Sequence, residues 1–232
     1  AGMRGSKCSA WEGGTRAFSF WRWPGKWKPQ VVDHLTAHLD VFPTLCELAS
    51  IQIPKEIENK LEGFNLSPLL EVKSDTKWQP DRILYHHVAR WPSGFAKSHK
   101  HAMVGVRQGN HLMLKSRPCG DPQCLEYMSQ CKALNAVERG SENMTYAYGT
   151  AQYHWGLSPK EHWVLYDVKK DPGCKNDLSK KNPLIVSRLT KAYDSWWNNI
   201  FPKMIAMGGD LGNPDELRNN AKRAKQKKND KK

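Results

Sequence analysis

Residues 163–197 read WVLYDVKKDPGCKNDLSKKNPLIVSRLTKAYDSWW, and they contain a strand, a turn and a helix in direct succession. The apolar run over 163–168 is typical of a buried strand. Asp171-Pro172-Gly173 supplies the turn that follows it. A strand next to a helical pattern predicts a small layer of sheet with a helix packed on it.

The helix of this stretch has both a start signal and a regular apolar face. Asn182 followed by Pro183 is a residue pair that helices favour at their N-terminus. Apolar residues then recur at steps of three and four, so we expect a long helix over 182–201 whose apolar face packs on the sheet. Pro202 should kink or end this helix.

Two upstream segments complete the sheet. RILYHHV at 82–88 is typical of a strand. HAMVGVRQGNHLMLKS at 101–116 alternates apolar and polar residues on both sides of Gly109-Asn110, which predicts a hairpin. We therefore expect a small antiparallel sheet in this half of the chain.

The N-terminal half of the chain has a different pattern of apolar segments. AFSFWRW at 17–23 predicts a short buried strand, and residues 31–35 form a second apolar stretch. Asp40 is placed as an N-cap, and the helix after it should end near Ser50. The apolar residues of this helix follow helical spacing: Leu39, Phe42, Leu45 and Leu48 or Ala49.

Composition excludes some classes of protein. The chain has 232 residues, 39% of them apolar, and no apolar run long enough for a membrane span. Almost half of the net charge of +13 comes from residues 219–232, NNAKRAKQKKNDKK. Such a tail is typical of disorder and of loose contact with polyanions, so we favour a solubilising tail over a nucleic-acid site.

The six cysteines leave their pairing open. Cys119, Cys124 and Cys131 cluster, but with spacings unlike those of a zinc ribbon. A disulfide within this cluster, with or without Cys174, requires an oxidising compartment. Cys46 lies on the apolar side of its helix, which indicates a buried free thiol.

Three ordered blocks of this sequence resemble the sulfatase family. GMRGSKCSAWEGGTR at 2–16 is similar to the Gly-x-x-x-Gly-x-Lys-x-x-x-(Tyr/Trp)-Glu-Gly-Gly-x-Arg stretch of arylsulfatases. HLDVFPTLCELA at 38–49 resembles the family's Asp-x-x-Pro-Thr-Leu helix. Residues 163–197 resemble its C-terminal Leu-Tyr-Asp, Asp-Pro-Gly and Asn-Leu segment. Residues 89–160 carry no such block.

The resemblance implies an α/β fold of the alkaline-phosphatase-like superfamily, of which this chain is a fragment. Residues 1–72 would be the C-terminal end of the catalytic α/β domain, with the closing strands and helix of its large sheet. Residues 73–207 would form a small C-terminal α+β subdomain with a long helix on an antiparallel sheet. Residues 208–232 would be a basic disordered tail.

The resemblance also implies an activity, the hydrolysis of sulfate esters. In the family a formylglycine nucleophile, made from Cys or Ser in Cys-x-(Pro/Ala)-x-Arg, and calcium-binding aspartates precede the first block. No Cys or Ser here has an Arg four positions later. We therefore expect a C-terminal portion that lacks the nucleophile and the calcium site, binds no cofactor by itself and is inactive alone. Its partners would be the N-terminal catalytic region and a sulfate ester, with no specific nucleic acid and no membrane.

One site residue follows from the first block. Lys7 matches the family's active-site lysine, which contacts a sulfate oxygen. An ammonium group on a flexible stem can stabilise charge that develops on such an oxygen. Glu12 and Arg16 are interpreted as a structural pair or as backbone anchors, and Gly13-Gly14 as a tight turn beside the site.

Further substrate contacts are proposed from the strand that begins at residue 82. His86, His87, Arg90 and Trp91 could line a pocket for a sugar or an aryl group, although an ordinary role at the edge of a sheet is the stronger alternative. A non-catalytic basic module that binds nucleic acid or sulfated glycans is the alternative function. The particular sulfate ester stays open, and so does the localisation, although many relatives are exported.

Overall fold

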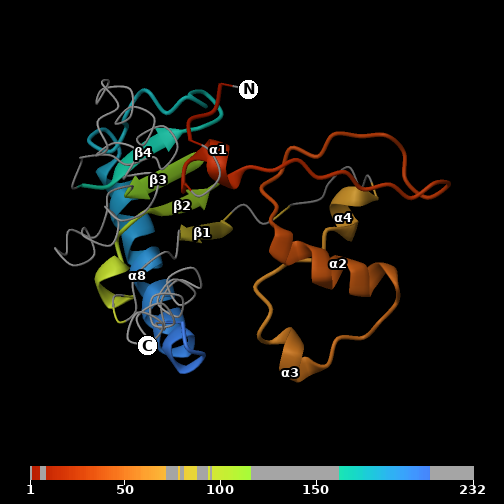
Figure 1. The fold of residues 1–232 in the computed structure, drawn as a ribbon. Helices are drawn as coiled ribbons and strands as arrows, with labels where there is room; N and C mark the ends of the chain where they lie inside the picture. Colours follow the sequence, from red (N-terminus) through yellow and green to blue (C-terminus); the bar gives the residue numbers. More distant parts are fainter. Residues whose placement is uncertain are drawn as a thin grey trace, which may run out of the picture. The chain divides into compact units, whose positions relative to one another are not determined.

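The computed structural model describes residues 2–5, 9–71, 78, 81–87, 94, 96–115 and 162–209. Contacts within the chain divide it into two compact units (Figure 1). Unit 1 joins Ala1–Arg16 to Tyr85–Lys232, and unit 2 is Ala17–Leu84. The first sixteen residues therefore pack with the C-terminal half of the chain, although they are distant from it in sequence.

A four-stranded sheet forms the centre of unit 1. Its strands are β1 (Ile83–His87), β2 (Val104–Gln108), β3 (His111–Lys115) and β4 (Val164–Asp167), in the order β1-β2-β3-β4. The pairs β2–β3 and β3–β4 are antiparallel, and Gln108 lies opposite His111 at the hairpin turn. The predicted strands and hairpin are thus confirmed.

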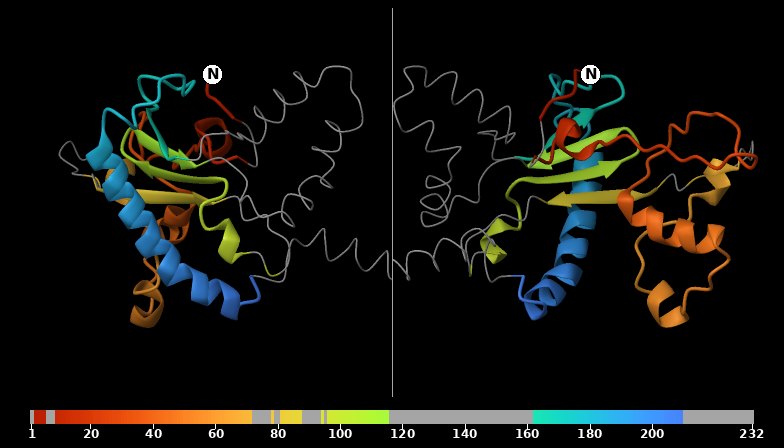
Figure 2. Two further views of the ribbon diagram at one scale, coloured as in Figure 1. Left: turned by 90° about the vertical axis from the view of Figure 1, so that its left-hand side faces the viewer. Right: turned by 45° about the vertical axis from the view of Figure 1, so that its right-hand side comes forward.

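The helix α8 (Pro183–Ala206) lies along one face of this sheet (Figure 2). The Thr190 hydroxyl donates a hydrogen bond to the sulfur of Met113 on β3, at 3.9 Å. Leu189 and Tyr193 of α8 are fully buried. The predicted long helix is confirmed, but it continues through Pro202 to Ala206, so this proline does not end it.

Residues from the N-terminal block cover the other face of the sheet. Ala10 and Trp11 pack in one apolar cluster with Leu112 and Leu114 of β3. Since side chains alternate along a strand, Leu112 and Leu114 face these residues while Met113 faces α8. A side chain at Gly105 of β2 would lie 2.9 Å from the carbonyl oxygen of Ala10, so glycine permits the close approach. The sheet is therefore buried on both faces.

Unit 2 consists of short helices and extended segments. Its helices are η1 (His38–Asp40), α2 (Val41–Leu48), α3 (Lys55–Glu58) and α4 (Ser67–Leu70). A small core gathers around α4, and its members are Leu66, Leu69 and Leu70, with Trp21, Trp27, Val32 and Trp78 packed against them. Core packing is thus the role of two of the tryptophans in FWRWPGKW.

Asp40 and Arg82 form a buried ion pair that holds unit 2 together. Two guanidinium nitrogens of Arg82 each lie 2.7 Å from a carboxylate oxygen of Asp40, and both side chains are almost completely buried. The same carboxylate accepts hydrogen bonds from the backbone N–H groups of Ala37 and Phe64. Asp40 does precede α2, but its side chain does not cap that helix. Asp40 is thus the N-cap residue, as predicted, but the side-chain capping bond is missing because Arg82 and these two amides occupy the carboxylate.

The predicted strand over 17–23 is also wrong. This segment is extended but pairs with no other strand among the residues that the structure describes. Its Phe18 and Phe20 are 88% and 90% exposed. An extended chain becomes a strand only when a neighbour accepts and donates its ladder hydrogen bonds, and the described part of the chain offers none to this segment.

The remaining predictions concern domain boundaries and segments outside the described residues. The division by contacts differs from the predicted domain ends at residues 72 and 207, but the assignment of these ranges to domains of an intact protein stays a prediction. The cysteine cluster at 119–131 and nearly all of the tail over 208–232 lie outside the described residues. None of the described helices is long and apolar enough to cross a membrane.

Candidate functional site

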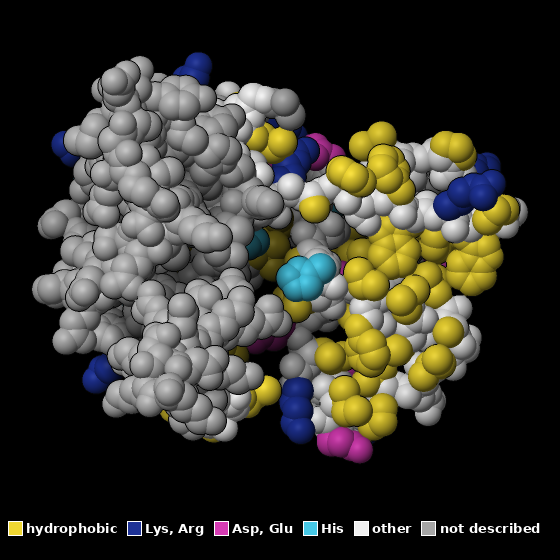
Figure 3. Space-filling view, viewed as in Figure 1, with side chains coloured by type: hydrophobic (Ala, Val, Ile, Leu, Met, Phe, Trp, Pro, Cys, Tyr) yellow, Lys and Arg dark blue, Asp and Glu magenta, His cyan; other side chains and the backbone are white. Residues whose placement is uncertain are grey.

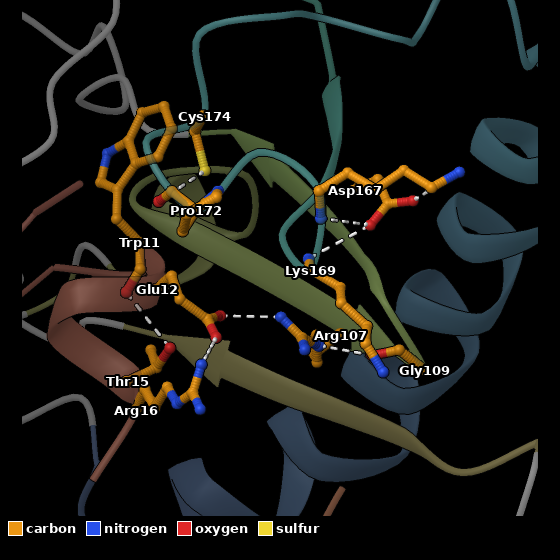
Figure 4. A network of polar contacts seen from close by, with 11 residues as sticks. Trp11, Glu12, Thr15, Arg16, Arg107, Gly109, Asp167, Lys169, Pro172 and Cys174 are labelled. Atoms are coloured by element: carbon orange, nitrogen blue, oxygen red, sulfur yellow. Dashed lines mark hydrogen bonds and ion pairs between the residues drawn. The ribbon is translucent and has the colours of Figure 1, made fainter. Parts of the chain in front are cut away.

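Within unit 1, the carboxylate of Glu12 in the Trp-Glu-Gly-Gly block lies between two arginines. The short helix α1 (Glu12–Thr15) carries Glu12, whose Oε2 accepts a 2.7 Å hydrogen bond from Arg107 of β2. Arg16 lies 3.7 Å from Oε1 of the same carboxylate (Figure 4). The Glu12 side chain is 7% exposed, that of Arg107 is 15% exposed and that of Arg16 is 60% exposed. Arg107 is therefore the stronger partner.

Arg107 remains a cation although it is largely buried. Burial lowers its pKa, while the negative charge of Glu12 raises it again. Its Nε donates a second hydrogen bond, of 2.7 Å, to the carbonyl oxygen of Gly109. The interpretation of Glu12 and Arg16 as a structural pair is confirmed. No local pattern in the sequence points to Arg107, because it lies 95 residues away from Glu12.

Trp11 attaches the same block to β4 and to the turn after it. The indole is buried, and its centroid lies 5.6 Å from the ring of Tyr166. The guanidinium carbon of Arg4 lies 4.0 Å from the indole centroid, which is a cation–π contact. The Arg4 amide also donates to the carbonyl oxygen of Pro172. A hydrogen bond therefore joins the Asp-Pro-Gly turn to the N-terminal block.

The two ends of the segment between Gly5 and Gly13 lie in backbone contact with each other. The Gly13 amide donates a 2.8 Å hydrogen bond to the carbonyl oxygen of Arg4. A Cβ atom at Gly13 would lie 2.5 Å from the carbonyl oxygen of Gly5. Gly13 is thus required for the close approach of two backbone segments, rather than for the tight turn that the sequence suggests. Gly5 has φ of +87°, a conformation that favours glycine.

Lys7 lies within this segment, but it is outside the described residues together with Ser6 and Cys8. The nearest described neighbours are Gly5 on one side and Ser9 on the other, and both are buried. The structure therefore gives the base of the segment that carries Lys7, while the sulfate contact of Lys7 stays a prediction.

Cys174 beside this base is a buried free thiol. Burial raises the pKa of Cys174 to about 12, so the thiol is neutral near pH 7 and is a poor nucleophile. Cys46 in unit 2 is also free and buried, as the sequence predicts.

His86 and His87 are neighbours on β1, so their side chains leave opposite faces of the strand. The ring of His87 stacks on Trp197 of α8 at 5.2 Å, and its Nε2 lies 3.0 Å from the carbonyl oxygen of His99. Burial lowers the pKa of His87 to about 4, so the imidazole is neutral near pH 7. The two histidines therefore do not point into one pocket. Arg90 and Trp91 lie outside the described residues, and the substrate role of all four residues stays a prediction.

Ion pairs and a hydrogen bond join α8 to the segment after η2 (Lys97–His99). The Lys100 ammonium lies 2.6 Å from the Asp194 carboxylate, and His101 Nε2 lies 3.4 Å from the same oxygen. The Tyr193 hydroxyl donates to the carbonyl oxygen of Lys100. These contacts give His101 a role in packing against α8.

The described residues do not fit the calcium that the resemblance implies. Among them, no three His, Cys, Asp or Glu side chains gather so that they could hold a metal ion. The whole sequence also lacks the formylglycine motif. The described residues therefore support no chemical step that involves calcium or formylglycine.

Comparison with known proteins extends the resemblance from three blocks to most of the chain. No protein-family model matches. Human arylsulfatase A is 41% identical over 176 residues, which are 76% of this chain. Human steryl-sulfatase is 24% identical over 177 residues. The chain covers only 28% and 26% of the length of these two relatives.

The fold is also similar to that of a solved sulfatase. This structure comes from work on the metabolism of glycosaminoglycans by Bacteroides thetaiotaomicron, and it matches with a TM-score of 0.54 at 20% sequence identity. The match covers 84% of this chain and 32% of that one. Such low identity supports the fold alone. The family rests on the sequence relatives. The chain belongs to the sulfatase family.

Proposed function

We propose that this chain is the C-terminal portion of a sulfuric ester hydrolase of the arylsulfatase type. The observation that carries the proposal is the 41% identity with human arylsulfatase A over three quarters of the chain. The nucleophile and the calcium site would be supplied by the N-terminal catalytic region, and the chain alone would be inactive. Within such an enzyme, residues 1–72 would belong to the catalytic domain, 73–207 to a small subdomain and 208–232 to a basic tail.

In this proposal Lys7 contacts a sulfate oxygen of the substrate. Cleavage of a sulfate ester places negative charge on the sulfate oxygens and on the leaving group, and a fixed ammonium group stabilises that charge. Stabilisation is strongest when the cation is held in place before the reaction. The anchoring of Glu12 on Arg107, at 2.7 Å, and of Trp11 on Tyr166 would supply this fixed support.

Residues at the end of β1 and directly after it are proposed as substrate contacts. His86, Arg90 and Trp91 would face the sugar or aryl group of the ester. His87 is kept in this set as a proposal, although its stacking on Trp197 favours a packing role.

The test is the hydrolysis of an aryl sulfate by the native gene product that contains residues 1–232. It should be produced with a formylglycine-generating enzyme and with calcium, and a matched sample should consist of residues 1–232 alone. We expect turnover from the native gene product and none above a heat-inactivated control from the chain alone. A native gene product that hydrolyses no aryl, glycan or steroid sulfate would contradict the proposal, and so would turnover by the chain alone.

A further inference from the structure

The loop between β4 and α8 in unit 1 is rich in exposed lysines. Residues 169–181 read KKDPGCKNDLSKK, with five lysines, two aspartates and no arginine. We call this segment the lysine loop, and all five of its lysines are exposed: Lys169, Lys170, Lys175, Lys180 and Lys181. Exposed Lys and Arg side chains (dark blue) project from the face of the molecule that Figure 3 shows.

The carboxylates of this region are occupied by backbone amides. Asp171 Oδ2 accepts hydrogen bonds from two consecutive amides of the loop, at 2.8 and 2.7 Å. Asp177 Oδ1 accepts two more, at 3.2 and 2.9 Å. Asp167, which ends β4, accepts from the amides of Lys169 and Lys170 (Figure 4). Lys170 also lies 3.8 Å from the Asp167 carboxylate, but the last three lysines of the loop form no ion pair with a described residue.

Backbone hydrogen bonds give the lysine loop a fixed course. The Leu178 amide donates a 2.7 Å hydrogen bond to the carbonyl oxygen of Leu165 on β4, and the Cys174 amide donates to that of Asp171 at 2.9 Å. The Cys174 side chain is buried in the apolar cluster of unit 1. The lysines are therefore held on a preorganised backbone, which lowers the entropy cost of binding a ligand. The tail over 219–232 is equally basic, but its sequence predicts disorder.

Two further cations extend this basic surface along α8. Arg188 and Lys191 are exposed, and they lie three positions apart, on one side of the helix. They stand about 8 and 12 Å along the helix axis from Pro183, where the lysine loop ends. Asp194 is the only acidic residue between positions 178 and 206, and it pairs with Lys100 at 2.6 Å. The surface thus keeps an excess of positive charge.

The composition of the lysine loop favours one kind of polyanion. Surfaces for single-stranded nucleic acid combine cations with aromatic platforms, and phosphate recognition favours arginine, whereas the loop has no aromatic residue and no arginine. Segments that lie on membranes add an apolar band to their cations. The loop has no exposed large apolar side chain, and Leu184 on the first turn of α8 stands alone. Lysines without either companion fit a chain of sulfate groups, which they contact as point charges.

We propose that the lysine loop, together with Arg188 and Lys191, is an accessory binding surface for a polysulfated polysaccharide. Its affinity comes from the number of ammonium–sulfate contacts rather than from a shaped pocket, so it falls steeply with salt. The choice of a sulfated chain among the polyanions rests on the proposed function, because such a chain also carries sulfate esters. The binding itself requires no hydrolysis and no contact with Lys7.

Binding of heparin, a polysulfated polysaccharide, to the native gene product tests this proposal. Its Kd is measured at several NaCl concentrations for the wild type and two triple variants. The loop variant replaces three lysines by Gln: Lys175, Lys180 and Lys181. The control variant makes the same change at three exposed lysines of unit 2: Lys28, Lys55 and Lys60. The loop variant should bind at least about tenfold more weakly near 0.15 M salt, with a salt slope of log Kd lower by roughly two to three. The control variant should change Kd by at most about twofold.

Two more variants separate charge and loop from other causes. Replacing the same three loop lysines by Arg keeps the charge, so Kd should stay within about threefold of the wild type. A loss in this variant too would show that charge is not what binds, and would overturn the proposal. Deletion of residues 219–232 should leave the effect of the loop variant intact. If the effect disappears with the tail, the tail is the binding segment and the proposal is wrong.

Other ligands serve as competing outcomes. Equal weakening by the loop and control variants would leave only a general effect of net charge and would overturn the proposal. A DNA duplex that binds as tightly as heparin, with an equal loss in the loop variant, would assign the surface to nucleic acid. A loss seen only with phosphatidylserine vesicles would assign it to lipid. If heparin binding depends on the lysine loop but no sulfate ester is hydrolysed, only the proposed function fails.

Discussion

Replacement of Glu12 by Gln should destabilise the protein by about 2–3 kcal/mol, because it leaves Arg107 as a largely buried cation without its carboxylate. The two groups are 2.7 Å apart, and their side chains are 7% and 15% exposed. At an effective dielectric constant of about 20, unit charges about 4 Å apart attract each other by roughly 4 kcal/mol. The remaining hydrogen bond from Arg107 to Gly109 and its slight exposure reduce the loss.

The assay is a double-mutant cycle by urea unfolding of the native gene product. Glu12→Gln and Arg107→Met should each cost about 2–3 kcal/mol, and the double variant should cost about 2 kcal/mol less than their sum. Arg16→Ala is the matched control, since Arg16 is 60% exposed and lies 3.7 Å from the carboxylate. It should cost under about 0.5 kcal/mol. A coupling energy below about 0.5 kcal/mol between Glu12 and Arg107 would refute the reasoning.

Two further predictions concern buried ionisable groups. Burial lowers the pKa of His87 to about 4, so the unfolded chain binds more protons between about pH 4 and 6.5, and stability falls as the pH falls through this window. The loss at pH 5 is about 1–2 kcal/mol. His87→Phe should therefore reduce the difference in Tm between pH 7 and pH 5, and an unchanged difference would contradict the assignment. Asp40→Asn should cost about 3–5 kcal/mol in urea unfolding, because Arg82 stays buried and charged; a loss under about 1 kcal/mol would mean that the pair contributes little.

The local structure of unit 1 could be predicted from the sequence. The hairpin around Gly109, the strand at 163–168 and the helix that starts at Pro183 follow from periodicity and turn chemistry. These elements pack on one another, so their apolar faces find partners inside the same part of the chain. The helix continues through Pro202 and ends at Ala206, shortly before Gly208-Gly209.

The structure of unit 2 could be predicted only in part. The helix after Asp40 and the burial of its Cys46 follow from the sequence, while its Phe42 and Leu45 are about half exposed. Phe18 and Phe20 were placed in a strand, yet a strand needs a neighbour that the sequence of one segment does not specify. This error concerns a segment for which the described residues supply no neighbouring strand.

The candidate site shows the same division between local and distant contacts. The pairing of Glu12 with Arg16 follows from helical spacing. The contact of Glu12 with Arg107 does not, because no local pattern joins residues that are 95 positions apart. Gly13 was correctly recognised as necessary, but the reason is a close approach to Gly5.

The central claim is most directly tested by kcat/KM of the native gene product for an aryl sulfate, with and without the charge of Lys7. Lys7→Ala should lower kcat/KM by roughly a hundred- to a thousandfold, which corresponds to about 2–4 kcal/mol of transition-state stabilisation, while Tm stays unchanged. Lys28→Ala, which removes the same charge from an exposed position outside the block, should leave both values unchanged. A Lys7→Ala enzyme within about threefold of the wild type would contradict the account, since less than about 0.7 kcal/mol would then depend on this residue.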